Sequence, residues 1–322
     1  MRIPTFYIFL CLCTIIACKQ EKKAPGNTVS KKQLPEKFIV VLGIAQDAGY
    51  PQIGCDKECC QRYWDERESK KSITCLGLVD SKTNQYWLFE ATPDITKQLK
   101  DVEFYVPGRS GHSPDGIFIT HAHIGHYTGL MQFGREAMGA KDIPVWVMPR
   151  MDSFLRNNGP WSQLVSLNNV KLNTLRADSA VAISPSFKIT PVKVPHRDEY
   201  SETVGFVIES DKKKILFIPD IDKWEKWGRD IIAEIGKVDI ALLDGTFYQN
   251  GELPGRDMSE VPHPFVEESL KKFSILSSQE RSKIIFIHFN HTNPLLRKSS
   301  AEKDSVRTKG FGVAEEGMII GM

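Results

Sequence analysis

Three histidines follow directly on a short apolar run. The run covers residues 117–119, and the histidines are His121, His123 and His126, all within six residues. A run of this kind predicts a strand, and a tight loop after it can turn neighbouring imidazoles toward one point. Neutral imidazole binds Zn²⁺ or Fe²⁺ well, whereas three cationic rings this close would repel one another. We therefore expect a metal site here rather than three solvated loop histidines.

Several other strand-type runs also stop at an aspartate or a histidine. The run at 189–194 leads to His196, and the run at 214–218 leads to Asp220. The residues at or just beyond such strand ends are Asp94, His121, His196, Asp220, Asp244 and His288. Loops at the edge of a sheet bring side chains from distant segments together, and such edges often hold ligands. The pattern predicts one shared site along the rim of one sheet or of two.

The expected elements alternate hairpins with helices. Strands are expected at 38–44, 72–79, 85–90, 143–148, 189–194, 204–210, 214–218, 238–243 and 283–287, and helices at 127–138, 150–158, 223–235 and 264–276. With 322 residues, 41% of them hydrophobic, the chain can bury a large core. These features predict an α/β fold with two β-layers covered by helices.

The charge balance argues against nucleic acid as a partner. Lysine and arginine number 42 and aspartate and glutamate 40, which leaves a formal net charge of +2. Domains that bind nucleic acid usually carry a basic patch or a recognisable motif, and the sequence shows neither. We expect a small-molecule substrate instead.

The first 18 residues have the pattern of an export signal. Arg2 precedes an apolar run at 6–17, which is too short to span a membrane as a mature helix. The ending IIAC resembles the lipobox of bacterial lipoproteins, which implies acylation of Cys18; an ordinary signal peptide with an incidental cysteine is the alternative. We expect a leader at 1–18, a polar tether at 19–37 and a folded domain at 38–322. The lipid would anchor the domain in the cell envelope, facing the periplasm or the exterior.

Four cysteines belong to the expected folded domain. Cys55, Cys59 and Cys60 lie in or near a loop, and Cys75 lies inside a strand-type run. In an exported protein a disulfide is the first expectation, and the spacing C-x₃-C-C differs from the paired C-x₂-C of common zinc sites. A disulfide, free thiols and a structural metal site all remain open.

The segment HAHIGH at 121–126 resembles the H-x-H-x-D-H signature of the metallo-β-lactamase superfamily, with Gly125 at the position of the aspartate. The resemblance implies an αββα sandwich of two mixed β-sheets covered by helices. It implies one or two Zn²⁺ ions, with Fe²⁺ or Mn²⁺ as alternatives. By position it assigns two groups of ligands: His121, His123 and His196 in one, and His126, Asp220 and His288 in the other, with Asp220 able to bridge them.

The glycine at position 125 affects the expected mechanism. In the superfamily's pattern the aspartate binds the second metal and orients the metal-bound water, and Gly125 can do neither. We therefore expect a weaker second site or a single ion, with Asp220, or another carboxylate such as Asp94, in the catalytic role of orienting water. The main interpretation is an exported hydrolase whose metal-bound hydroxide attacks an ester, lactone, amide or phosphodiester bond. A relative that only binds metal or ligand is a further alternative.

Longer segments resemble the B proteins of pyrroloquinoline quinone biosynthesis, a group within the same superfamily. The segments are VLGIAQDAGYPQ, EATPDI, HAHIGHYTGL, LLDGTFY, GRDMSEVPHP and IHFNHTNPLL. This group implies iron-dependent oxidation during cofactor maturation, which is the alternative to hydrolysis. Asp244, His263 and His291 are candidates for contacts to the substrate or to the metal ligands, and structural hydrogen bonds are the other interpretation for the two histidines.

Overall fold

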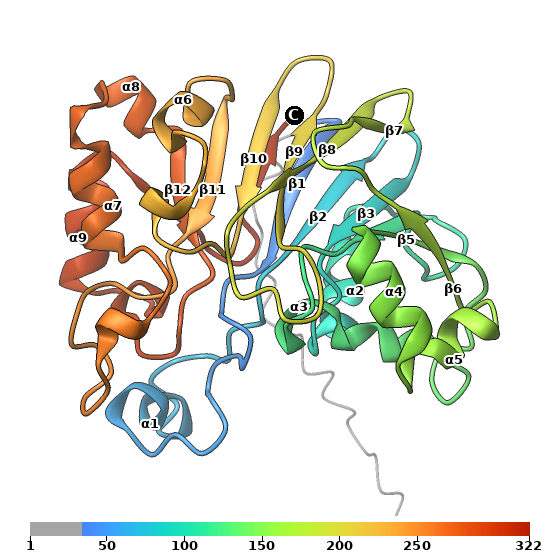
Figure 1. Ribbon diagram of the computed structural model, residues 1–322, viewed down its shortest axis with the longest axis horizontal. Helices are drawn as coiled ribbons and strands as arrows, with labels where there is room; N and C mark the ends of the chain where they lie inside the picture. Colours follow the sequence, from blue (N-terminus) through green and yellow to red (C-terminus); the bar gives the residue numbers. More distant parts are fainter. Residues whose placement is uncertain (1–33) are drawn as a thin grey trace, which may run out of the picture. The chain divides into compact units, whose positions relative to one another are not determined.

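The computed structural model describes residues 34–322, which form two stacked β-sheets with helices on their outer sides (Figure 1). The expected leader with Cys18, and most of the expected tether, lie outside the described residues. The two mixed sheets and their helical cover confirm the expected αββα arrangement. In the part of the chain that the structure describes, no helix is long and apolar enough to cross a membrane.

The first sheet has seven strands in the order β14-β1-β2-β3-β4-β5-β6. Its strands are β1 (Lys37–Gly43), β2 (Cys75–Asp80), β3 (Gln85–Phe89), β4 (Gly116–Phe118), β5 (Ile143–Val147), β6 (Val170–Thr174) and β14 (Ile319–Gly321). The strands β14, β1, β2 and β3 pair antiparallel, and β3 to β6 run parallel. The loop that leaves the end of β4 carries His121 and His123.

The second sheet also has seven strands, in the order β13-β12-β11-β10-β9-β8-β7. They are β7 (Val181–Ser184), β8 (Phe187–Lys193), β9 (Val204–Glu209), β10 (Lys214–Ile218), β11 (Ile240–Asp244), β12 (Ile284–Ile287) and β13 (Gly312–Val313). The strands β10 to β13 run parallel, so their carboxyl ends share one edge. Asp220, Asp244 and His288 stand at that edge, after or at the ends of β10, β11 and β12.

The helices lie in two sets outside the sheets. In Figure 1, α2, α4 and α5 accompany the first sheet and α6 to α9 accompany the second. The helices are α1 (Glu58–Trp64), α2 (Ile95–Glu103), α3 (Ile124–Tyr127), α4 (Pro149–Asn157), α5 (Trp161–Ser166), α6 (Ile231–Ile235), α7 (Val266–Lys272), α8 (Ser278–Arg281) and α9 (Ala301–Thr308).

The prediction of a single helix at 127–138 was wrong. The chain instead forms the short α3 and then a 3₁₀ helix at Thr128–Phe133. Gly129 explains the difference, because its N–H donates to Ala91 O at 2.9 Å and a Cβ there would lie 2.1 Å from Thr92 O. This close approach holds the segment after His126 against the loop that follows β3. The segment therefore forms a 3₁₀ helix instead of a regular α-helix.

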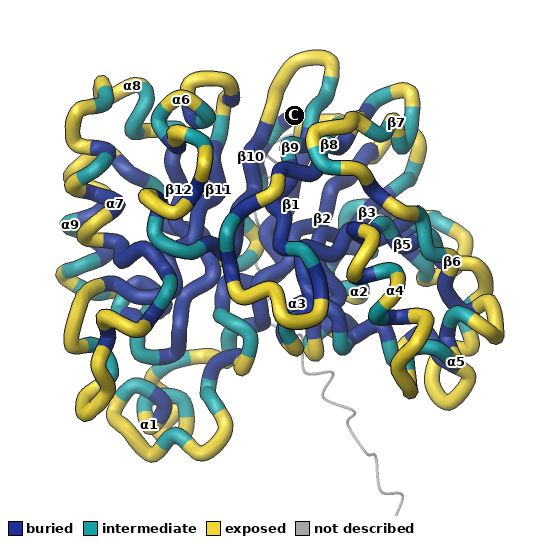
Figure 2. Tube along the Cα trace, in the orientation of Figure 1, coloured by how far each residue is buried: buried dark blue, intermediate teal, exposed yellow. Residues whose placement is uncertain are grey.

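Both faces of the first sheet are buried, which explains why its strands read as continuous apolar runs. Ile39 and Val41 of β1 pack into the core between the sheets, and the alternate residues Phe38 and Val40 pack into a second core under the helices. Figure 2 shows the strands buried and the exposed positions confined mainly to loops and to the outer sides of the helices. Two packed layers of this kind fix the strand ends at which the polar residues gather.

Candidate metal centre

Side chains from several strand ends meet in three groups of possible metal ligands. Within each group, one atom per residue lies within 4.8 Å of the others. The first group is His121, His123, His196 and Asp220, the second is Asp47, His126, Asp220 and His288, and the third is Asp220, Asp244 and His263. Asp220 belongs to all three. The structure thus brings together the six ligands that the superfamily signature assigns, and it adds Asp47.

Four buried polar atoms of the first group have no hydrogen-bond partner among residues 34–322. They are His121 Nε2, His123 Nδ1, His196 Nε2 and Asp220 Oδ1. A buried polar atom without a partner costs on the order of 1–3 kcal/mol, so each one needs an explanation. Three imidazole nitrogens and one carboxylate oxygen are a donor set that suits Zn²⁺ or Fe²⁺. The residues present therefore fit a divalent metal.

His121 and His288 each form a hydrogen bond through Nδ1, which leaves Nε2 available to bind a metal. Thr120 Oγ1 donates to Glu90 Oε1 at 2.6 Å, so it accepts from His121 Nδ1 at 2.8 Å. Thr246 Oγ1 likewise donates to a carboxylate at 2.7 Å and accepts from His288 Nδ1 at 3.0 Å. With the proton on Nδ1, each ring keeps the lone pair on Nε2. Such supporting bonds orient metal-binding histidines and set their tautomer.

The surroundings of His121, His123 and Asp220 favour the protonation states that bind metal. Burial lowers the pKa of His121 well below its usual range, and the charge of His126 adds to this effect. Burial also lowers the pKa of His123 to about 4. Burial raises the pKa of Asp220, but the charge of His196 and of neighbouring imidazoles outweighs it and holds this pKa well below its usual range. Neutral imidazole and ionised carboxylate are the ligand forms.

The sequence analysis missed Asp47. Its Oδ1 lies 2.9 Å from His126 Nε2 and 3.4 Å from His288 Nε2. The second group therefore contains a carboxylate besides Asp220. The sequence had suggested that Gly125 leaves the second site without this additional carboxylate. A signal was present in the sequence, because Asp47 follows the end of an apolar run just as Asp220 does.

Asp94 lies apart from the three groups. Its carboxylate accepts a hydrogen bond from Ile73 N at 3.0 Å and pairs with Lys70. No ligand group of the described residues includes it. This placement gives Asp94 a structural role, in holding the chain before β2 against the start of α2.

Asp244 and His263 lie beside the centre. His263 Nδ1 is 2.8 Å from Asp244 Oδ2, to which it donates, and 3.1 Å from Asp220 Oδ1. Burial lowers the pKa of His263, but the charges of Asp244 and Asp220 outweigh it and raise this pKa to about 9. The pair thus holds a proton on Nδ1 next to the shared carboxylate.

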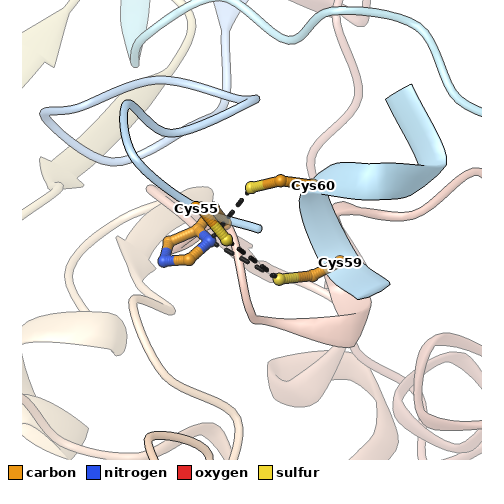
Figure 3. A group of neighbouring side chains, drawn as sticks. Cys55, Cys59 and Cys60 are labelled. Carbon is orange, nitrogen blue, oxygen red and sulfur yellow. Dashed lines mark hydrogen bonds between the residues drawn. The ribbon is translucent and has the colours of Figure 1, made fainter. Parts of the chain in front are cut away.

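His291, the remaining candidate for a contact to the substrate or to the metal ligands, lies in a different cluster. The cluster contains Cys55, Cys59 and Cys60, which Figure 3 labels. Its Nδ1 is 3.3 Å from Cys60 Sγ and 3.6 Å from Cys59 Sγ, and Cys55 Sγ is 3.7 Å from Cys59 Sγ. All three cysteines, and the buried Cys75 elsewhere, are free thiols in the structure. Three thiols and one imidazole are a donor set found in structural zinc sites. We refer to Cys55, Cys59, Cys60 and His291 as the cysteine cluster.

Comparisons with known proteins identify the family of this chain. A family model described as a beta-lactamase superfamily domain matches residues 86–289. Coenzyme PQQ synthesis protein B of Rhizobium meliloti is 26% identical, over 87% of this chain and 96% of its own length. The protein of the same name from Klebsiella pneumoniae is 27% identical, over 88% and 97%.

Solved structures show the same fold. Zn(2+)-bound PqqB from Methylobacterium extorquens has a TM-score of 0.73 at 22% identity, covering 88% of this chain and 100% of that one. A diphosphatase from the PhnP family has a TM-score of 0.58 at 19% identity, covering 88% and 96%. The chain therefore belongs to the metallo-β-lactamase superfamily, in which it is similar to the PQQ synthesis protein B group.

Proposed function

We propose that this protein is a metal-dependent hydrolase whose centre takes two divalent ions and acts on a small molecule. The observation that carries the proposal is the set of buried, unpartnered donor atoms around Asp220. These atoms converge from both sheets, and the other ring nitrogens of His121 and His196 already contact Thr120 and Asp222. In a cluster of polar side chains on the surface, water would hydrogen-bond to such atoms. The atoms around Asp220 are buried, so another partner must satisfy them.

The residues divide into recognisable roles. His121, His123 and His196 would hold one ion, and the second group would hold the other, with Asp220 between them. Zn²⁺ is the ion that we expect, with Fe²⁺ or Mn²⁺ as alternatives. When bound, such ions lower the pKa of water to about 7 and polarise the bond under attack.

Two further features support a reaction on a small molecule. His263 Nδ1, which donates to Asp244, lies 3.1 Å from Asp220 Oδ1 and keeps a donor beside the centre. A pocket of about 560 Å³ opens next to the second group, with Asp47, Phe247 and Arg256 among its lining residues. This volume is in the range of small-molecule sites.

The test is metal content together with turnover. Purified protein should contain zinc or another divalent ion, and it should hydrolyse at least one member of a panel of esters, lactones, amides and phosphodiesters. Removal of the ion by a chelator should abolish turnover, and its return should restore it. Protein that contains no metal and is inactive on the whole panel would refute the proposal. Protein that contains metal and is inactive would instead favour a binding protein.

The curated relatives favour a second candidate more directly than they favour hydrolysis. They are named for the synthesis of coenzyme PQQ and match 87–88% of this chain. Under this candidate the same ligands hold iron, and a quinone-like precursor is oxidised with O₂ as the oxidant. Oxygen uptake by the Fe²⁺-loaded protein that depends on such a substrate would support it, and hydrolysis by a zinc form without O₂ would exclude it.

For the location of the protein, we propose export and anchoring through a lipid on Cys18. The support is the IIAC sequence after an apolar run at 6–17. Cells fed a labelled fatty acid should incorporate the label into the wild-type chain and not into Cys18→Ser. The variant should also leave the membrane fraction. Equal labelling of both chains would contradict this proposal without affecting the metal centre.

A further inference from the structure

In the H-x-H-x-D-H signature the aspartate stands at position 125, and in this structure Asp47 fills the space that its side chain would take. A Cβ built on Gly125 would lie 2.4 Å from Asp47 Cα and 2.8 Å from both Asp47 Cβ and Oδ1. Real Cβ atoms do not approach other heavy atoms this closely. The absence of a side chain at position 125 is therefore a condition for Asp47 to stand where it does.

The backbone holds Asp47 firmly in this place. Gln46 N donates to Phe289 O, and Phe289 N donates to Ile44 O, both at 2.8 Å. Gly49 N donates back to Gln46 O at 2.7 Å, with Gly49 at φ +71°, a conformation that favours glycine. Because Phe289 follows His288 directly, the same bonded pair of segments sets the position of both Asp47 and His288.

The side chain of Asp47 points at the second group and is largely buried. Its Oδ1 faces Nε2 of His126 at 2.9 Å and Nε2 of His288 at 3.4 Å, and its side chain is 15% exposed. A largely buried carboxylate that faces two imidazole nitrogens is a suitable metal ligand.

We propose that Asp47 and Gly125 form a compensating pair, in which the loop after β1 supplies the carboxylate ligand of the second ion and Gly125 leaves room for it. This inference rests on the proposed metal centre. It identifies a ligand outside the H-x-H-x-D-H signature, and it means that the second site is complete. It also means that Gly125→Asp alone cannot restore the signature, since the new side chain would displace Asp47.

The first test is Asp47→Asn in the full chain, titrated with Co²⁺. Cobalt is chosen because thiolate ligands give it a charge-transfer band that imidazole and carboxylate do not, so binding by the cysteine cluster is counted separately. We expect the wild type to bind two equivalents at the centre. The variant should keep one equivalent at nearly wild-type affinity and bind the other at least about 10-fold more weakly. Asp56→Asn is the matched control, because Asp56 is exposed and lies on the same loop.

The second test is Gly125→Ala, which changes no ligand. It should reproduce the loss of one equivalent, because the added methyl group pushes Asp47 away from the two imidazoles. Gly228→Ala is the control, since a Cβ on Gly228 meets nothing within 4 Å. Should Gly125→Ala fail to fold, Asp47→Asn remains decisive because it keeps the size of the side chain.

Three outcomes are distinguishable. A wild type that binds no Co²⁺ outside the cysteine cluster overturns both the proposed function and the role of Asp47. A wild type and an Asp47→Asn variant that bind equally, whether one equivalent or two, overturn the role of Asp47 and leave the metal centre standing. Loss of one equivalent in Asp47→Asn and in Gly125→Ala, but in neither control, supports the compensating pair.

Discussion

At the scale of single residues, Asp220 is the side chain on which the candidate centre depends most. It is 2% exposed and belongs to all three ligand groups. Its Oδ2 lies 3.4 Å from Nε2 of both His121 and His126, and its Oδ1 lies 3.5 Å from His196 Nε2. Asp47 is a second carboxylate among the candidate ligands, so Asp220 is not the one anionic ligand. Asp47, however, belongs to a single ligand group. Asp220 is the carboxylate that belongs to both of the groups in which we expect an ion.

We predict that Asp220→Asn lowers metal affinity at the centre by at least about 10-fold, because it keeps the shape and removes the charge. Equilibrium competition with a chelator measures this affinity. Asp239→Asn is a suitable control, since Asp239 is exposed and precedes β11, whose other end carries Asp244. Equal metal content and activity in Asp220→Asn and the wild type would show that Asp220 is a structural residue.

The sequence indicated most candidate ligands but could not indicate how Asp47 and Gly125 relate. His121, His123 and His126 stand close together, and Asp220 ends a clear apolar run, so local patterns were sufficient for them. The contact between Asp47 and Gly125 joins two loops that are far apart in the chain, and only the folded structure shows that one fills the space left by the other.

At the scale of elements, buried strands were predictable and edge strands were not. β3 and β10 coincide with expected runs because both faces of these strands are covered, so every residue after the first is apolar and buried. β6 and β7 lie at the sheet edges, where several of their side chains are partly or fully exposed, and neither had been expected. Both edge strands are short, and too few residues remain for a clear periodic signal.

Two loops link the candidate metal centre to the cysteine cluster. The loop between β1 and β2 carries Asp47, and α1 within it carries Cys59 and Cys60. The loop after β12 carries His288 and, three residues later, His291. The cysteine cluster therefore joins the same two loops that present ligands to the second group. A change in the cysteine cluster should therefore alter the position of Asp47 and, with it, metal binding at the centre.

We predict that Cys60→Ser weakens metal binding by the second group by up to about 10-fold, as loss of a supporting contact does at other metal sites. Cys60 Sγ accepts from Gln52 N at 3.4 Å and contacts His291 Nδ1 at 3.3 Å, so its loss loosens both loops. Co²⁺ titration measures the effect. Cys75→Ser, which changes a buried thiol outside the cluster, should leave the second group unchanged. Equal losses in the two variants would indicate general destabilisation instead.

At the scale of the whole molecule, residues 35–322 form one compact unit. If this unit unfolds as a whole, the ionisation of one group in its interior changes the stability of all of it. Glu252 is such a group, with a partly buried carboxylate. Its carboxylate accepts from Tyr248 N at 2.6 Å and from Thr292 Oγ1. Burial raises the pKa of Glu252 from 4.5 to about 7, against the opposing effect of these hydrogen bonds. The folded state therefore holds this proton more tightly than the unfolded state does.

The sign of the pH dependence follows from this difference. The stabilisation from protonated Glu252 is fully present below about pH 4.5 and is lost as the pH rises through about 7. Its upper limit is on the order of 3 kcal/mol, at 1.36 kcal/mol per pKa unit. In Glu252→Gln this loss disappears, so the stability of the variant relative to wild type should rise between pH 5 and pH 8. Urea unfolding at the two pH values measures the change, with the exposed Glu260→Gln as the control. A relative stability that is the same at both pH values would show that Glu252 ionises in the folded protein as it does in water.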